Sequence, residues 1–435
     1  MGGANVTRAC QPANGVSRGG FQSFGGAARL GRVKVLIVGS GGREHALAWA
    51  FGRSSELEEL HAAPGNPGIA ALGDCHPVRA EDPEGLLALA RGLHIDLVVI
   101  GPEAPLVAGV ADHLRRGGIA VFGPSAATAK IEGSKTFAKE VMAAAGVPTA
   151  SALAVARPPC VVKVDGLAAG KGVFVCRTGA EVDDALRAVA GTEGPLVIEE
   201  LLEGDELSVF ALSDGSRAVP LPAARDYSRV GDGDTGPNTG GMGSFSPVLG
   251  FGRDEIEALV EHIHRPVIRE LALRGTPFVG ALYAGLMLTE EGPRVLEFNC
   301  RFGDPETQAI VPRLDGDLLM LLAAAAEGDL GRAEAPQANG AAVTVALAAS
   351  DYPARGDSGT PISGVEDAER SGALVFHAGT ARQGNSLVTN GGRILGVTGV
   401  GETVAVARAQ AYAAIEKISF EGMRYRTDIA AGVDG

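Results

Sequence analysis

Residues 297–306 read EFNCRFGDPE and follow directly on a short strand-like segment. Side chains two apart in a strand share a face, so Glu297 and Asn299 present a carboxylate and an amide oxygen to one spot while Phe298 turns into the core. Hard cations such as Mg²⁺ take such oxygen ligands, commonly together with substrate phosphates. Arg301 lies on the same side if the strand continues, where it can clamp an anion. The stretch predicts a metal–nucleotide site, against the alternative of an ordinary strand end with solvated charges.

The length and composition indicate a globular protein of several domains. The chain has 435 residues, which is too long for one core, so about two to four domains are expected. Its formal net charge is −14, which argues against a general binder of nucleic acid or of anionic membranes. An anionic small substrate is not excluded, because lysines, arginines, a metal and backbone N–H groups can hold it locally.

The cysteines and the N-terminal segment bear on the compartment. Five scattered cysteines without a CxxC pair indicate reduced thiols and a cytoplasmic protein. No apolar run approaches the ~18 residues of a membrane span. Residues 1–32 are rich in Gly, Ala and Ser, have no acidic residue and lack the apolar region of a secretory signal. A transit peptide is conceivable, but we interpret this segment as a disordered extension or an over-long start, and we begin the fold at Val33.

A strand, a glycine turn and a helix open the fold. Residues 33–38 read VKVLIV, GSGGRE follows, and HALAWA is helical, which is typical of a doubly wound α/β unit. The turn is not a dinucleotide fingerprint, because Arg43-Glu44 stands where GxGxxG has its third glycine. Backbone N–H groups at Gly41 and Gly42 could hold a phosphate, and a tight turn without a ligand is the alternative.

A second α/β unit supplies further residues at the same rim. Residues 96–100 form the strand, 101–106 the turn at its carboxyl end, and 107–116 the predicted helix. Ligands of open α/β sheets bind at these carboxyl ends, so Glu103 is a candidate for a ribose or amine contact. The loop 64–68, which contains Asn66, is a third candidate on this rim.

The region from 126 to 335 is predicted to be a larger α+β domain. A helix from Lys135 to Ala145 precedes the strand 160–164, which leads into a Gly/Ala loop and a second strand. Small residues let the backbone reach a phosphate, and Lys163 and Lys171 supply charge. A Walker loop is absent, and a glycine-rich hairpin with a surface lysine is the alternative.

Two further segments of this domain have the composition of ligand-binding loops. Residues 196–206 form a strand edge and an acidic turn that could place backbone against adenine and a carboxylate against ribose, although a solvated hinge is commoner. Residues 225–243 are so polar and glycine-rich that we predict a structureless lid over a substrate, with a disordered linker as the alternative.

Residues 336–430 are predicted to form a small C-terminal α+β domain. Strands are expected at 341–349, 372–378 and 393–398, and a helix at 403–418. The Asn-Gly pair within 389–392 predicts a hairpin turn.

The motifs together resemble the phosphoribosylamine–glycine ligase (glycinamide ribonucleotide synthetase) family of the ATP-grasp superfamily, over about residues 33–430. The matching stretches are VLIVGSGGREHALAW, APGNPG, VIGPEAPLVAGV, FGPSAATAKIEGSK, VVKVDGLAAGKGV, VIEELLEGDE, DTGPNTGGMGSFSP, YAGLM, EFNCRFGDPETQ, FHAGT and VTNGGR. The resemblance implies a Rossmann-like N-terminal domain (33–125), an ATP-grasp domain (126–335) with a lid subdomain at about 136–200, and the C-terminal α+β domain.

The resemblance also implies the chemistry. ATP would phosphorylate glycine, and the amine of 5-phosphoribosylamine would attack the glycyl phosphate, giving glycinamide ribonucleotide, ADP and phosphate. The implied metal ligands for Mg²⁺ or Mn²⁺ are Glu297 and Asn299. The implied ATP contacts are Lys135, Lys163, Lys171, Glu199, Glu200, Leu202 and Glu206. Arg301, Asp304 and Asp226 would act in catalysis. The implied contacts to phosphoribosylamine and glycine are Gly41, Gly42, Asn66, Glu103, Asp234, Thr235, Asn238 and Gly241.

The partners implied are small molecules, with neither nucleic acid nor membrane, and the expected state is a monomer or weak homo-oligomer. The lid subdomain is shorter than usual in the family, because only residues 151–160 separate Pro-Thr-Ala from the lysine-bearing strand. Two other hypotheses remain: a different ATP-grasp carboxylate–amine ligase or carboxylase, and a nucleotide-binding protein without catalysis.

Overall fold

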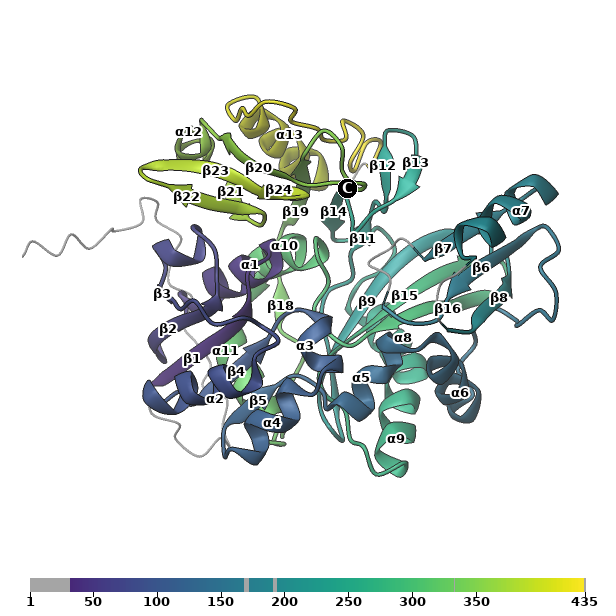
Figure 1. Ribbon diagram of the computed structural model, residues 1–435. Helices are drawn as coiled ribbons and strands as arrows, with labels where there is room; N and C mark the ends of the chain where they lie inside the picture. The colour runs from purple at the N-terminus through teal and green to yellow at the C-terminus, as the bar shows by residue number, and fades with distance from the viewer. Residues whose placement is uncertain (1–31, 168–171, 191–193, 332, 434–435) are drawn as a thin grey trace, which may run out of the picture.

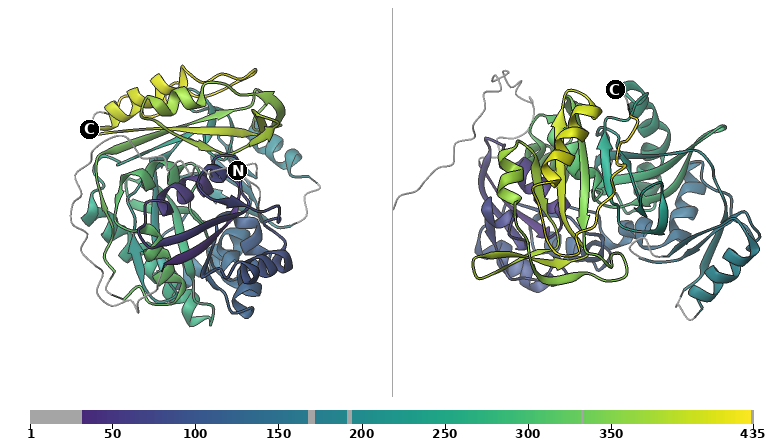
Figure 2. Two further views of the ribbon diagram at one scale, coloured as in Figure 1. Left: turned by 90° about the vertical axis from the view of Figure 1, so that its left-hand side faces the viewer. Right: turned by 90° about the horizontal axis from the view of Figure 1, so that it is seen from above.

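The computed structural model describes residues 32–167, 172–190, 194–331 and 333–433. Figure 1 shows an N-terminal sheet beside a central sheet, a small three-stranded sheet that projects from the central body, and the C-terminal strands across the top. The views in Figure 2 place the C-terminal sheet over both the N-terminal and the central parts. None of the helices within the described ranges combines the length and apolar character needed to cross a membrane.

The N-terminal sheet is parallel, with the strand order β3-β2-β1-β4-β5, which confirms the doubly wound unit. Its elements are β1 (Val33–Gly39), α1 (Gly42–Phe51), β2 (Leu57–Pro64), β3 (Asp74–Cys75), α2 (Pro83–Gly92), β4 (Leu97–Ile100), α3 (Glu103–Val107), α4 (Val110–Arg116) and β5 (Ala120–Phe122). The chain leaves β1 for β2 on one side and returns to β4 on the other. The carboxyl ends of β1 and β4 therefore form the crevice where open α/β sheets bind ligands.

One helix of this unit differs from the prediction. The single helix expected over 107–116 is wrong: α3 begins already at Glu103, and α4 starts only after Gly109. Gly109 has a φ of 85°, in the left-handed region that glycine tolerates, and this turn separates the two helices.

The central part contains a four-stranded sheet and a smaller three-stranded one. The larger sheet has the order β10-β9-β15-β16, from β9 (Asp205–Asp214), β10 (Ala218–Pro220), β15 (Val279–Thr289) and β16 (Gly292–Asn299). The smaller sheet has the order β7-β6-β8, from β6 (Cys160–Val164), β7 (Val173–Cys176) and β8 (Leu196–Glu200), and α7 (Gly179–Ala188) packs on it. β6 and β7 pair antiparallel on either side of the Gly/Ala loop, so the two strands expected there are confirmed, while residues 168–171 of the loop lie outside the described residues.

Helices cover the central sheet and connect it to the rest. They are α5 (Ala126–Gly133), α6 (Lys135–Ala145), α8 (Arg253–Leu259), a π-helical turn (Val260–His264), α9 (Arg265–Leu273), α10 (Glu306–Ile310) and α11 (Leu318–Ala326). The predicted bounds of α6 are confirmed: Ser134 caps its first turn by accepting from the N–H of Phe137, and Gly146 ends it with a φ of 68°.

The C-terminal sheet recruits strands from the central region. Its order is β11-β14-β19-β24-β21, from β11 (Arg225–Asp226), β14 (Gly243–Ser246), β19 (Ala341–Ala348), β24 (Arg393–Gly401) and β21 (Leu374–His377). A second sheet contains β20 (Asp357–Pro361), β23 (Ser386–Gly391) and β22 (Thr380–Gln383), and the helices are α12 (Val365–Arg370) and α13 (Val404–Ile415).

The prediction that residues 225–243 are structureless is wrong, whereas their role as a lid stays a prediction. β11 pairs with β14, and between them β12 (Arg229–Gly231) and β13 (Thr235–Asn238) form a hairpin. Backbone pairing needs no apolar side chains, and the hairpin is anchored instead by Arg426, whose side chain is 1% exposed and ion-paired with Asp234 at 2.7 Å. Composition alone could not show a partner so distant in the chain.

The hairpin turn predicted within 389–392 is also wrong. β23 and β24 lie in different sheets and do not pair with each other, so this segment is a crossing between sheets. The tight turn lies earlier, at Gly384-Asn385 between β22 and β23.

Three buried histidines predict a loss of stability in mild acid. Burial lowers the pKa of His45 to about 3, and that of His377 and His264 to about 4. Each folded-state pKa lies below the unfolded value of about 6.5, so the stabilisation is complete above pH 6.5 and is lost as the pH falls below it. Below pH 6.5, each histidine is expected to lower the free energy of unfolding by up to ~1.4 kcal/mol for each unit by which the pH falls.

Urea unfolding at several pH values between 6.5 and 5 tests this. Nδ1 of His45 accepts the N–H of His377 at 2.8 Å, so the pair also joins α1 to β21. His45→Asn removes one titrating group, and its pH slope is expected to be shallower than that of the wild type by about one proton. Identical slopes would contradict the assignment of this proton to His45.

Candidate active site

The end of β16 has the expected side-chain geometry. Glu297 and Asn299 lie on one face, with Nδ2 of Asn299 3.4 Å from Oε1 of Glu297, while Phe298 is 2% exposed in the core. The residue paired with Glu297 on β15 is Gly285, and a side chain there would begin 3.6 Å from Cγ of Glu297. A side chain at Gly285 would therefore only touch the stem of Glu297.

Three of the predicted ATP residues converge on this strand end. A cavity of about 40 Å³ is lined by Lys135 of α6, Lys163 of β6 and Glu199 of β8, together with Glu297 and Asn299. Figure 1 shows why they meet: the small sheet and α6 both face β16. The structure thus brings together residues that are up to 164 positions apart in the chain, from Lys135 to Asn299. Lys171 lies outside the described residues.

Glu199 is held between two lysines. Its side chain is 3% exposed, with Oε2 2.6 Å from Nζ of Lys163 and Oε1 2.5 Å from Nζ of Lys139. Nζ of Lys163 also donates to the carbonyl oxygen of Leu296 at 3.0 Å, which ties the small sheet to β16. Lys139 was missed by the sequence analysis, although its position four residues after Lys135 places it on the same helix face.

The other predicted ATP contacts do not all face the cavity, because neighbouring side chains in a strand point to opposite faces. Glu200 points away from Glu199, and its Oε1 accepts from the N–H of Ser151 at 2.7 Å and from Arg294 at 2.9 Å. Leu202 is half-buried beyond β8. Glu206 lies on β9, where desolvation and the nearby Glu297 raise the pKa of its carboxyl group.

Arg301 lies between two carboxylates. Its Nε is 3.3 Å from Oε2 of Glu103, and its Nη2 is 3.1 Å from Oε1 of Glu132 and 3.2 Å from Oδ1 of Asn299. Glu132 also accepts the N–H of Cys300 at 2.8 Å, and burial raises the pKa of its carboxyl group. Glu132 was missed, because nothing near it in the sequence signals a partner 169 residues away. The guanidinium is thereby fixed beside Asn299, which is predicted to be a metal ligand.

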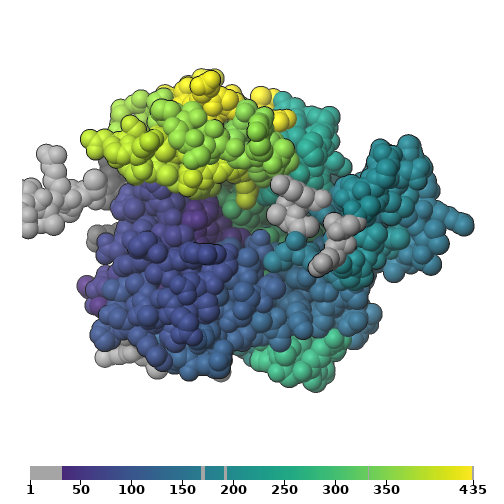
Figure 3. Space-filling view, viewed as in Figure 1, coloured from purple at the N-terminus to yellow at the C-terminus, as the bar shows by residue number. Residues whose placement is uncertain are grey.

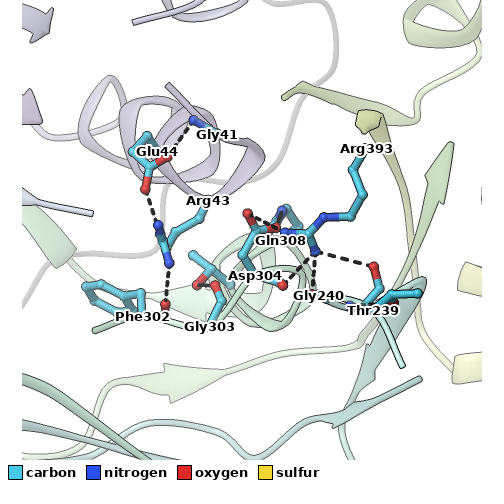
Figure 4. Close-up of polar contacts among 12 residues, drawn as sticks. Gly41, Arg43, Glu44, Thr239, Gly240, Phe302, Gly303, Asp304, Gln308 and Arg393 are labelled. Atoms are coloured by element: carbon cyan, nitrogen blue, oxygen red, sulfur yellow. Dashed lines mark hydrogen bonds and ion pairs between the residues drawn. The ribbon is translucent and has the colours of Figure 1, made fainter. Parts of the chain in front are cut away.

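Asp304 joins the central part to the C-terminal sheet (Figure 4). Its Oδ2 is 3.1 Å from Nη2 of Arg393, and its Oδ1 accepts from Nε2 of Gln308 at 2.7 Å. Nη1 of Arg393 also donates to the carbonyl oxygens of Asp304 at 2.7 Å and Gly240 at 2.6 Å. Burial alone would raise the pKa of Asp304, but Arg393 and Arg43 hold it below the ordinary value. Arg393 was missed because no local pattern links it to Asp304, 89 residues earlier in the chain.

In the predicted phosphate loop, the side chain of Glu44 accepts a backbone hydrogen bond of the loop. The N–H of Gly41 donates to Oε2 of Glu44 at 2.5 Å, and Oε1 of Glu44 accepts from Nε of Arg43 at 2.6 Å (Figure 4). Glu44 is 1% exposed and occupies the space beside Gly101, where a Cβ would lie 1.9 Å from its Oε1. Arg43-Glu44 therefore replaces the third glycine of a dinucleotide fingerprint with a side chain that fills the turn.

The side chain of Asn66 makes its hydrogen bonds to other parts of the protein. Its Nδ2 donates to the carbonyl oxygens of Ser40 at 2.9 Å and His377 at 2.8 Å, and its Oδ1 accepts from the N–H groups of Gly68 and Ile69 at 3.0 Å each. The side chain thus fixes the 64–68 loop against the β1 turn and the C-terminal sheet.

An acidic cluster surrounds Asp226. Burial first, and then the charges of Glu306 and Glu206, raise the pKa of Asp226 well above its ordinary value, while Oγ of Ser228 donates to it at 3.1 Å. Burial also raises the pKa of Glu306. A carboxyl group of this kind can hold or accept a proton near neutral pH.

The remaining predicted substrate contacts, within residues 234–241, lie in three different places. Asp234 and Thr235 lie at the exposed hairpin tip, with Asp234 paired to Arg426 and Oγ1 of Thr235 donating to the carbonyl oxygen of Asp232. Asn238 faces a cavity of about 570 Å³ between the hairpin, β7 and α7. Gly241 packs on Pro305, where a Cβ would lie 2.3 Å from the ring. Only Gly241 reaches the Asp304 segment directly.

Comparison with known proteins gives one consistent result. Models of phosphoribosylglycinamide synthetase match along the chain: its N domain over residues 33–132, its ATP-grasp (A) domain over 133–307 and its C domain over 342–432. The phosphoribosylamine–glycine ligase of Agrobacterium fabrum is 48% identical over 91% of this chain and 98% of its own length, and that of Streptomyces coelicolor is 47% identical over 93% and 100%.

Solved structures agree. The crystal structure of the phosphoribosylamine–glycine ligase of Thermotoga maritima superposes with a TM-score of 0.80 at 38% identity, covering 92% of this chain and all of that one. The biotin carboxylase domain of Hydrogenobacter thermophilus 2-oxoglutarate carboxylase has a TM-score of 0.67 at 18% identity, covering 90% of this chain and 92% of that one, and shares the fold. From its motifs, its site geometry and these matches, the chain belongs to the phosphoribosylamine–glycine ligase family of ATP-grasp enzymes.

Proposed function

We propose that the protein joins glycine to 5-phospho-D-ribosylamine at the expense of ATP, through glycyl phosphate, and releases glycinamide ribonucleotide, ADP and phosphate. This is the second step of de novo purine biosynthesis. One observation carries the proposal: Lys135 and Lys163 share a cavity with Glu297 and Asn299, and Arg301 contacts Asn299 from the side of the N-terminal crevice. In this proposal a nucleotide site and a sugar-phosphate site adjoin at Arg301, which also contacts Glu103 of α3.

The residues at the end of β16 suit a divalent cation held together with ATP. The donor set is one carboxylate and one amide oxygen, which is the hard-oxygen chemistry that Mg²⁺ or Mn²⁺ prefers. Glu297 and Asn299 would hold the ion, and substrate phosphates would complete its coordination. When bound, the ion neutralises phosphate charge during transfer.

The protein's own cations supply the rest of the electrostatic stabilisation. Lys135 and Lys163 face the cavity from two elements and would contact the ATP phosphates. Phosphoryl transfer depends mainly on positioning and on neutralised charge, so fixed cations lower its barrier. Arg301, held by Glu103 and Glu132, would stabilise the transferred phosphoryl group on the glycine carboxylate.

The second half of the reaction needs a proton acceptor. The amine of phosphoribosylamine loses a proton when it forms the amide bond and phosphate leaves. Asp226 has a raised pKa and lies with Glu306 and Glu206 on the acidic side of the site, so it would accept this proton or hold the ammonium group of glycine. Acyl phosphates hydrolyse, so closure of the small sheet over the site would exclude water.

We also propose a reducing compartment, the cytoplasm. Cys160 and Cys176 are directly opposite each other across β6 and β7, and both are free thiols. Such a pair persists reduced where glutathione and thioredoxin act.

Substrate-omission assays test the proposed function. Purified protein with Mg-ATP, glycine and freshly generated phosphoribosylamine is expected to release ADP and glycinamide ribonucleotide in equal amounts, and to release neither product at a comparable rate when glycine or the amine is left out. Mass spectrometry identifies the ribonucleotide. ADP release that needs a different acid or amine would overturn the substrate assignment while keeping the ATP-grasp chemistry.

A further inference from the structure

Glu132 is a buried carboxylate without a substrate contact in the proposed reaction. It lies in the last turn of α5, its side chain is 8% exposed, and it lines the same cavity as Glu297 and Asn299. α5 packs against α3 and β16, apart from the projecting small sheet, and Figure 3 shows that this part of the body forms one surface with the N-terminal unit. A buried negative charge at the negative end of a helix is unfavourable unless other groups compensate it.

The compensating groups are the two residues that follow Asn299. Oε2 of Glu132 accepts the N–H of Cys300 at 2.8 Å, and its Oε1 lies 3.1 Å from Nη2 of Arg301. The same Nη2 donates to Oδ1 of Asn299 at 3.2 Å. One carboxylate therefore holds both the backbone directly after Asn299 and the guanidinium nitrogen that binds its amide.

This arrangement fixes which way the amide of Asn299 points. A guanidinium has only donors, so the atom of Asn299 that faces Arg301 is its oxygen, and Nδ2 then faces Oε1 of Glu297 at 3.4 Å. A carbonyl oxygen has two lone pairs, so Oδ1 can accept from Arg301 and still bind a cation, whereas a rotated amide would offer Nδ2, which cannot. The orientation of the amide thus decides whether Asn299 can act as a metal ligand.

Glu132 holds Arg301 more firmly than the other carboxylate beside it. Glu103 lies 3.3 Å from Nε of Arg301, but its side chain is 29% exposed, against 8% for Glu132. Water and salt screen an exposed ion pair more than a buried one. Glu132 is also the carboxylate next to Nη2, the nitrogen that binds Asn299.

We infer that Glu132 is a positioning residue for the metal pair: it orients Arg301, which in turn keeps the amide oxygen of Asn299 available to the cation. This inference rests on the proposed function, in which Glu297 and Asn299 hold Mg²⁺ or Mn²⁺. Groups that orient a metal ligand in this way typically change metal affinity about 10- to 100-fold when they are replaced.

Binding of ADP with and without Mn²⁺ measures this effect without turnover. ADP is titrated by calorimetry in excess Mn²⁺ and in EDTA into the wild type, Glu132→Gln and the control Glu140→Gln, whose side chain is exposed on α6. The factor by which Mn²⁺ strengthens ADP binding is expected to fall about 10-fold or more in Glu132→Gln. Affinity in EDTA should stay, because Lys135 and Lys163 remain in the cavity. Glu140→Gln should bind like the wild type.

A double-mutant cycle shows whether Glu132 acts through Arg301. Arg301→Lys keeps the positive charge but loses the planar fork that contacts both Glu132 and Asn299. It should reduce the Mn²⁺ effect by itself, and adding Glu132→Gln should reduce it little further. The turnover of Glu132→Gln should also recover as the concentration of Mn²⁺ is raised, which a general loss of folding would not produce.

The outcomes separate this inference from the proposed function. If the wild type binds ADP equally well with Mn²⁺ and in EDTA, the metal pair is wrong and the inference falls with it, while formation of glycinamide ribonucleotide still decides the proposed function. An unchanged Mn²⁺ effect in Glu132→Gln overturns the inference alone, and so do equal losses of ADP affinity under both conditions or additive losses in the cycle. Should Glu132→Gln not fold, Arg301→Lys decides, because an unchanged Mn²⁺ effect in that variant contradicts the inference.

Discussion

Glu297→Ala is expected to lower the rate of ADP formation by about 10³-fold or more, because it removes the only carboxylate of the predicted metal pair at the end of β16. Glu297 is exposed, so the unfolding transition should stay near that of the wild type. Steady-state kinetics with Mg-ATP, together with the urea midpoint, measure both effects.

Two companion variants sharpen this result. Glu290→Ala removes an exposed carboxylate from the turn between β15 and β16, and it should leave the activity unchanged. Glu297→Gln keeps the oxygen and loses the charge, so an intermediate rate that rises with the concentration of Mg²⁺ is expected. Wild-type turnover by Glu297→Ala would show that the metal site lies elsewhere.

Glu199→Ala is expected to destabilise the small sheet by about 3–5 kcal/mol, because the substitution leaves two buried or half-buried ammonium groups without their shared carboxylate. Lys139 and Lys163 come from different elements, and Glu199 is the charge that lets them lie close together. Hydrogen exchange of the backbone amides in β6 and β8 reports the local opening, and urea unfolding reports the global effect.

The neighbouring residue provides the control for this prediction. Glu200 makes its ion pair with Arg294 on the opposite face, where its side chain is 36% exposed. Exposed pairs contribute about 0–1 kcal/mol, so Glu200→Ala should change the exchange rates of β6 and β8 little. Equal effects of the two substitutions would mean that burial between the lysines is not what makes Glu199 important.

Local sequence rules were sufficient to predict the positions of site residues that lie on the same helix or strand. The period of two in β16 predicted that Glu297 and Asn299 lie on the same face. The start of α6 at Lys135 followed from the serine before it, and its end at Ala145 followed from the glycine after it. The resemblance then connected these elements to Lys163 and Glu199, which periodicity alone could not bring to the same cavity.

Long-range partners were beyond such rules. Glu132 and Arg393 are as much part of the site as the residues that were predicted, but each acts on a segment about 90 to 170 positions away. The prediction that residues 225–243 are structureless failed for the same reason. The strands in this segment are stabilised by β19 and by Arg426, which come much later in the chain. Neither composition nor turn propensity contains that information.

The mixed origin of the C-terminal sheet has a consequence for synthesis of the protein. β14 pairs with β19, and β19 pairs with β24 on its other side. On a ribosome that adds roughly 5–20 residues per second, the backbone of β14 emerges on the order of five to twenty seconds before its partner β19 is made. During that interval the N-terminal sheet can fold, while the strand that carries Gly243–Ser246 has an open edge, so the nascent chain is most exposed to aggregation and to chaperones in this window.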